Sequence, residues 1–192
     1  MLCLIALPEP KLFIMKILKI ILIVFAVTIA IPLIAGLFIE KDFNIERQIT
    51  INKPRNEVFQ YVRYIKNQNR FSVWTNLDPN MKQEFRGIDG TVGFVSAWHS
   101  EDSGVGTGEQ EIKAIREGER VEFELRFKKP FENTAMAYMT TEDTGNETLV
   151  KWGMNGHMNY PMNVMSVLMR STLGKDLQTG LNNLKNIMEG NN

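Results

Sequence analysis

The residues of this sequence that could carry acid–base or nucleophilic chemistry are few. The 192 residues include two histidines, His99 and His157, and a single cysteine, Cys3. A general base needs a partner that sets its proton affinity, and a nucleophile needs a base beside it. Each histidine lies on the face of its predicted strand opposite an apolar residue, Trp98 or Trp152. We therefore expect both imidazoles to face solvent, and the sequence makes no carboxylate partner evident for either.

No metal or cofactor site is predicted. A single cysteine excludes an intrachain disulfide and a cysteine-based zinc site, and two histidines are too few for a histidine-rich metal centre. No glycine-rich phosphate loop precedes a helix, because residues 104–108 are typical of a hairpin connection. Basic and acidic residues balance at 22 each, so the chain lacks the basic footprint of a nucleic-acid-binding protein.

Two pairs of glutamates alternate along predicted strands, Glu109 with Glu111 and Glu122 with Glu124. Residues two apart share one face of a strand, and charged side chains on an outer face discourage edge-to-edge aggregation. We expect these carboxylates to be solvated rather than catalytic.

If the chain is an enzyme, its site needs at least one polar side chain on the inward face of the predicted strands. The alternation of residues allows three candidates for such a position, namely Ser96, Gln110 and Tyr138.

The elements that position these residues follow from the apolar pattern. Alternation is clearest over residues 120–129, where valine, phenylalanine and leucine alternate with charged residues, as in an antiparallel sheet with one buried face. Pro54 opens a helix after the first strand, and Phe71 and Trp74 follow in a second short helix or turn. The predicted strands are residues 42–51, 82–87, 91–100, 107–116, 120–129, 133–141 and 148–158.

A long amphipathic helix is predicted over residues 161–189. Its apolar residues recur at steps of three and four, which is the period of one helix face: Met162, Met165, Met169, Leu173, Leu177, Leu181, Leu184 and Met188. A helix of this length extends roughly 40 Å and needs a broad apolar surface to cover its stripe. The sequence therefore predicts an α+β fold in which a curved antiparallel sheet surrounds the C-terminal helix.

The N-terminal segment is predicted to cross a membrane. Residues 20–39 carry no charge and only one polar side chain, Thr28, and twenty such residues span roughly 30 Å as a helix. We expect a tail over residues 1–16, a transmembrane helix over residues 17–40 and one domain over residues 42–189. The apolar run is longer than a usual signal peptide core, which favours a retained single-pass anchor over a cleaved signal.

The residues that flank the predicted span bear on which side of the membrane the domain lies. Basic residues balance on the two flanks of the predicted span, so the positive-inside rule does not decide. Lys16 and Lys19 lie nearest the bilayer on one side, and Glu40 and Asp42 flank the other. Both facts favour an extracytoplasmic domain.

Several short segments, in order, resemble one known family. They are residues 51–59, Trp74, residues 91–93, residues 106–108, the "T-x-V-x-W" of residues 148–152 and the "G-L-x-x-L-K" of residues 180–185. Together they resemble the START-like, or SRPBCC, superfamily in its polyketide cyclase/dehydrase-like branch, over residues 42–189. The resemblance implies a helix-grip fold, in which a seven-stranded sheet grips the C-terminal helix around an apolar cavity.

Most of the residues expected to line that cavity follow from strand and helix parity. They are Phe94, Trp98, Phe123, Leu125, Phe127, Met136, Tyr138, Trp152, Met154, Met165 and Met169. Trp74 is expected to close one end of the cavity. Methionine is frequent among residues 154–169, and its flexible side chain suits a surface that adapts to varied apolar ligands.

Three functions remain open at this level. The first is a membrane-anchored protein that binds a lipid-like or other apolar small molecule between sheet and helix. The second is a cyclase or hydratase acting on an apolar substrate. The third is a regulatory or interaction domain whose interior is filled by its own side chains. The sequence identifies no protein partner.

Overall fold

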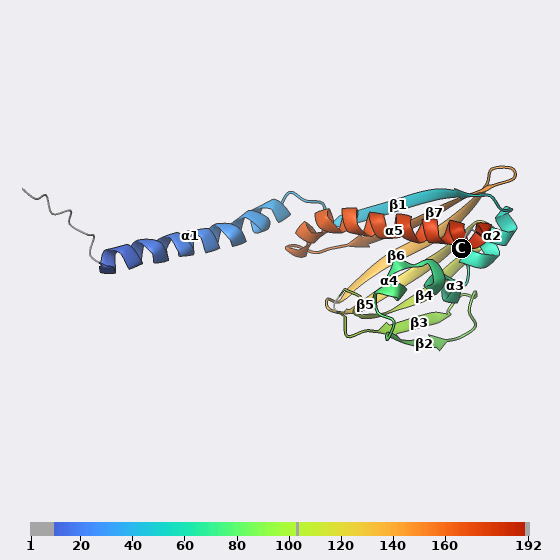
Figure 1. Ribbon diagram of the computed structural model, residues 1–192, viewed down its shortest axis with the longest axis horizontal. Helices are drawn as coiled ribbons and strands as arrows, with labels where there is room; N and C mark the ends of the chain where they lie inside the picture. The colour runs from blue at the N-terminus through green and yellow to red at the C-terminus, as the bar shows by residue number, and fades with distance from the viewer. Residues whose placement is uncertain (1–9, 103, 191–192) are drawn as a thin grey trace, which may run out of the picture.

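The structure is a computed structural model that describes residues 10–102 and 104–190 (Figure 1). One long helix, α1 (Pro10–Gly36), projects from a domain that holds all the other elements. The helices of the domain are α2 (Arg55–Val62), α3 (Ile65–Phe71), α4 (Val73–Leu77), the short 3-10 helix η1 (Met162–Val164) and α5 (Met165–Glu189). Its strands are β1 (Asp42–Ile51), β2 (Lys82–Arg86), β3 (Val95–His99), β4 (Thr107–Arg116), β5 (Arg120–Lys129), β6 (Asn133–Asp143) and β7 (Thr148–His157).

The strands form one seven-stranded antiparallel sheet in the order β1-β7-β6-β5-β4-β3-β2. Strands β2 to β7 follow one another as neighbours, and β1 joins the free side of β7. Thr148, at the start of β7, donates its hydroxyl to the carbonyl of Lys53 at 2.7 Å and so ties β7 to the turn after β1. The sheet curves around α5, which confirms the predicted α+β helix-grip fold.

One predicted strand is shorter than expected. We predicted a strand over residues 91–100, and β3 begins only at Val95. The backbone of Gly90 and Gly93 has φ of +77° and +88°, which an extended strand cannot contain. Val92 lies between them and is exposed rather than inward-facing.

The C-terminal helix packs on one side of the sheet. Helix α5 contacts β1 and β7, and also α3 and α4, and it buries Leu177, Leu181 and Leu184 completely. Figure 1 shows α5 running along β1 and β7, while the strands from β5 to β2 extend away beneath it. The far strands of the concave face therefore receive less cover from α5 than β1 and β7 do.

Helix α1 is apolar on all sides beyond Lys19. Its segment Phe13–Gly36 is long and apolar enough to cross a membrane, and only its last residue, Gly36, is buried in the molecule. The hydroxyl of Thr28 donates to the carbonyl of Val24 at 2.8 Å, so the polar side chain is satisfied within the helix. The helix begins at Pro10, within the predicted tail of residues 1–16, whose first nine residues lie outside the described residues.

Candidate functional site

Four of the twelve predicted cavity residues lie in the core between the sheet and α5. Phe94, Phe123, Trp152 and Met154 point to the concave face and are buried. The Trp152 ring meets the Phe71 ring edge-on, with centroids 5.5 Å apart. This part of the interior is filled by the side chains of the protein itself.

Five more predicted residues also face inward but are only partly buried: Trp74, Trp98, Leu125, Phe127 and Met169. Trp98 of β3 packs edge-on against Phe127 of β5 at 5.9 Å. The intervening residue of β4 is Gly108, where a Cβ would lie 2.6 Å from the indole of Trp98. Strands β3 and β5 lie beyond the part of the sheet that α5 covers. We therefore refer to their inward residues Trp98, Leu125 and Phe127 as the open face.

The predictions for Met136 and Tyr138 were wrong. In β6 the buried, inward side chains include Ala135, Ala137 and Met139, so Met136 and Tyr138 lie on the outer, convex face. The Tyr138 ring lies where a Cβ of Gly153 would be, and its hydroxyl donates to Glu46 at 2.5 Å. Burial, with this hydrogen bond, raises the pKa of Tyr138 to about 12.

The prediction for Met165 was also wrong. Met165 is exposed and lies outside the buried core. It belongs to the same α-helix as the buried Leu173, Leu177 and Leu181, but each step of four residues turns about 40° beyond a full circle at 3.6 residues per turn, so the predicted stripe drifts away from the sheet towards the start of α5. Asn163 and Ser166 take the buried positions instead.

Two of the three polar candidates do lie on the concave face. Ser96 is buried opposite Gln110, and the amide of Gln110 donates to the side-chain oxygen of buried Gln68 at 2.9 Å. Tyr138, the third, is outside. These groups are neutral hydrogen-bonding side chains, which can orient a ligand but do not exchange protons near neutral pH.

Two hydrogen-bond donors near the centre of the grip have capacity to spare. The indole nitrogen of Trp152 is buried, and it has no partner within the described part of the chain. Arg47 faces Trp152 across the β1–β7 ladder and lies under α5, where a Cβ at Gly174 would be 2.2 Å from its guanidinium. Its side chain donates to the Glu46 carbonyl at 2.7 Å. Buried donors without acceptors are uncommon in folded proteins and need a reason.

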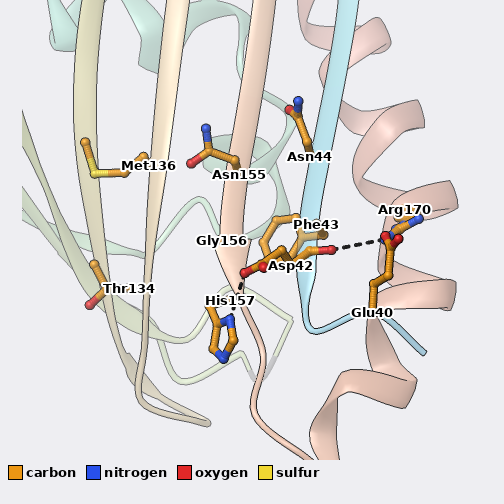
Figure 2. Close-up of a pocket in the computed structure, with 10 residues that line it drawn as sticks. All are labelled: Glu40, Asp42, Phe43, Asn44, Thr134, Met136, Asn155, Gly156, His157 and Arg170. Atoms are coloured by element: carbon orange, nitrogen blue, oxygen red, sulfur yellow. Dashed lines mark hydrogen bonds and ion pairs between the residues drawn. The ribbon is translucent and has the colours of Figure 1, made fainter. Parts of the chain in front are cut away.

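Two surface hollows lie outside the grip. The larger, of about 630 Å³, opens on the convex side near the end of α1, where Asn44, Met136 and Asn155 line it (Figure 2). His157 pairs with Asp42 at its edge, with Nδ1 and Oδ1 2.7 Å apart. The second, of about 310 Å³, lies between the start of β2 and the loop after β3.

Both histidines have carboxylate partners that the sequence did not make evident. His157 contacts Asp42, and the Nε2 of His99 lies 3.0 Å from Glu101. As predicted from parity, neither lies on the concave face. His99 lies on the face of β3 opposite Trp98, and His157 lies on the face of β7 opposite Trp152.

The outer glutamates are more enclosed than predicted. Arg126 binds Glu109 at 2.8 Å, Glu111 at 2.7 Å, and also Glu124. Arg86 donates a further hydrogen bond to Glu109 at 2.7 Å. Together Arg86 and Arg126 lower the pKa of Glu109 to about 2. These carboxylates form a structural ion-pair network, rather than the freely solvated charges we expected.

Sequence reasoning missed Arg47, Gln68 and Asn163. Arg47 shares its strand parity with Ile45 and Ile49, so its inward direction was visible in the pattern. Gln68 and Asn163 carried no comparable signal, because their burial depends on how α3 and η1 pack.

Comparison with known proteins places this architecture. A family profile described as "polyketide cyclase / dehydrase and lipid transport" matches residues 42–189. No curated protein matches the sequence.

Solved structures share the fold at low sequence identity. Truncated norcoclaurine synthase from Thalictrum flavum is 11% identical with a TM-score of 0.58, over 76% of this chain and 92% of its own. A protein from Nitrosospira multiformis is 15% identical with a TM-score of 0.55, over 76% of this chain and 96% of its own. A protein from Chromobacterium violaceum is 12% identical with the same TM-score and coverage. These likenesses extend to the fold alone.

The predicted resemblance is thus confirmed by both the sequence profile and the fold. The chain belongs to the polyketide cyclase / dehydrase and lipid transport family through its residues 42–189.

Proposed function

We propose that this protein is a membrane-anchored binding protein that takes a lipid-like apolar molecule against the open face of its grip. The observation that carries the proposal is the partial burial of Trp98, Leu125 and Phe127, which point to the concave side of the sheet. Apolar side chains lining a concave surface are typical of small-molecule sites. The family description, which includes lipid transport, supports the same ligand class.

Helix α1 would hold the grip beside a store of such molecules. Its length, its apolar surface on every side and its lack of burial in the molecule support a retained membrane anchor. The acidic flank at Glu40 and Asp42 and the proximity of Lys16 and Lys19 to the other end favour an extracytoplasmic domain.

Fluorescence quenching tests the binding site directly. The three tryptophans, Trp74, Trp98 and Trp152, all lie in the domain, so brominated stearic acid added to the full chain in phosphatidylcholine nanodiscs should quench them saturably. We expect Phe127→Gln to weaken binding about tenfold, since complete burial of a phenylalanine side chain contributes roughly 1.5 to 3 kcal/mol.

The matched control is Lys128→Gln, which introduces the same side chain one residue further on the opposite face of β5. It should leave the affinity unchanged. Equal affinities for the two variants, or quenching that never saturates, would contradict binding at the open face.

A further inference from the structure

The connection between α1 and the domain is a packed joint rather than a loose linker. Asn163 of η1 is completely buried, and its amide nitrogen donates to the carbonyls of Gly36 at 2.7 Å and Ile39 at 2.8 Å. Carbonyls at a helix C-terminus have no partner within the helix, so a buried side chain that satisfies them fixes the end of that helix. A Cβ at Gly36 would lie 3.1 Å from the side chain of Val164, which shows how closely η1 packs there.

Further contacts hold the chain on the other side of this joint. The backbone N–H of Met158 donates to the carbonyl of Lys41 at 2.8 Å. Arg170 of α5 donates to the carbonyl of Asp42 at 3.2 Å and pairs with Glu40 at 3.6 Å. The orientation of the domain relative to α1 is therefore set by the fold.

Beside this joint the domain presents an apolar surface, which we call the η1 patch. Its residues are between 40% and 68% exposed: Tyr160, Met162, Met165, Val167 and Leu168. No charged residue occurs from Met158 to Met169. The first turn of α5 thus buries the polar Ser166 and turns the apolar Met165, Val167 and Leu168 outward, which is the reverse of a helix whose outer side faces water.

The position of the patch identifies what covers it. It adjoins the end of α1, the helix proposed to cross the membrane, and two further exposed apolar residues, Leu37 and Phe38, follow that helix directly. Since the joint fixes the domain against α1, whatever surrounds the last turn of α1 also reaches the η1 patch. We propose that the η1 patch is immersed in the apolar–polar boundary of the same bilayer that α1 crosses, an inference that rests on the membrane anchoring proposed above.

The consequence concerns the open face. Trp98 lies near the end of β3 and Phe127 near the end of β5, and by register both strands end on the side of the sheet where β1 begins and α1 enters. The β5–β6 turn at this end also carries an exposed aromatic residue, Phe131. Figure 1 shows the end of α1, the start of α5 and this turn at one end of the domain. A domain seated in this way holds the rim of its open face against the lipid, so an apolar ligand passes between bilayer and grip without crossing water.

Fluorophores attached to single cysteines test the seating. In a Cys3→Ser background, the full chain carries a polarity-sensitive label at Leu168→Cys or at Asn182→Cys, an exposed position about 20 Å further along α5. After reconstitution into phosphatidylcholine vesicles, we expect the Leu168 label to show blue-shifted emission and quenching by bromine on the lipid chains. The Asn182 label should remain accessible to iodide in water.

A third label at Phe25→Cys, in the middle of α1, separates the two proposals. If the Phe25 label is in lipid and the Leu168 label is in water, the seating is wrong and the anchor stands. If the Phe25 label is also in water, the anchor itself is wrong. If the Asn182 label enters the lipid as well, the proposed orientation is overturned, because α5 would then lie along the membrane.

Discussion

At the scale of single residues, the outer face of the sheet is held by charge and the inner face by apolar contact. Arg126 sits among three carboxylates on β4 and β5, and the side chains of Glu109 and Glu111 are 13% and 22% exposed. Ion pairs that are this enclosed are screened less than surface pairs and contribute more than the usual few tenths of a kcal/mol. The network therefore contributes to the stability of the fold, and the binding proposed above concerns the opposite face.

Glu109 makes this contribution dependent on pH. Hydrogen bonds from Arg86 and Arg126 lower its pKa from an ordinary 4.5 to about 2. A carboxyl whose folded pKa is depressed stabilises the folded state above its unfolded pKa, and this stabilisation is lost as pH falls from about 4.5 toward 2. The drop corresponds to roughly 3 kcal/mol as an upper figure.

We expect Glu109→Gln to lower the free energy of unfolding by about 1–3 kcal/mol at pH 7 and by roughly half as much at pH 3. Urea denaturation of the full chain in detergent, followed by tryptophan fluorescence, measures both values. An equal deficit at the two pH values would show that the ionised carboxylate of Glu109 is not the source of the stabilisation.

At the scale of elements, the approach of α5 to the sheet depends on two glycines. Gly174 faces the guanidinium of Arg47, and Gly180 faces the indole of Trp152, with hypothetical Cβ distances of 2.2 Å and 2.6 Å. The two obstacles differ in kind, because an arginine side chain can move aside and a buried indole packed against Phe71 and Trp74 cannot.

This difference predicts unequal changes in stability for the same substitution. Gly180→Ala should cost about 1–3 kcal/mol through overpacking against Trp152, exceeding the gain of about 1 kcal/mol in helix propensity. Gly174→Ala should be within about 1 kcal/mol of the wild type, since Arg47 can rearrange while the helix gains. Urea denaturation of both variants checks this, and a larger loss at Gly174 would mean that Arg47 is held more firmly than Trp152.

At the scale of the whole molecule, the structure joins the long apolar helix α1 to the grip without a flexible tether. Only five residues separate α1 from β1. Among them, the carbonyl of Ile39 accepts from Asn163 of η1, the carbonyl of Lys41 accepts from Met158 just after β7, and the Glu40 side chain pairs with Arg170 of α5. In the seating proposed above, a joint of this kind fixes which end of the grip faces the bilayer. With a long flexible linker, the orientation of the grip relative to α1 would vary.

Asn163→Ala should loosen the joint without unfolding the domain. The carbonyls of Gly36 and Ile39 would lose their buried donor, at a cost of about 1–3 kcal/mol. We expect the amides of Leu37 and Phe38, which bond to the last turn of α1, to exchange about ten- to hundredfold faster. Hydrogen exchange of the full chain in nanodiscs measures this.

Asn186→Ala is the control for this measurement, because Asn186 is exposed on the far part of α5. Unchanged exchange at Leu37 and Phe38 in Asn163→Ala would show that Asn163 does not secure the end of α1.

The sequence by itself determined the elements and their order. Periods of two and of 3.6 identified seven strands and the C-terminal helix, because burial on one face imposes these periods on any half-covered strand or helix. The uncharged run of residues 20–39 identified the apolar N-terminal helix. Nine of the twelve predicted lining residues lie on the concave side or against it.

Only the tertiary structure decided which face of an ambiguous strand turns inward and which part of the grip stays open. In β6 the buried residues are Ala135, Ala137 and Met139, so Met136 and Tyr138, which alternate with them, lie outside. The burial of Asn163, the exposure of Met165 and the open face all depend on contacts between segments far apart in the chain. A local sequence pattern indicates whether a residue is buried but not which segment buries it. The joint between α1 and the domain was therefore visible only in the folded molecule.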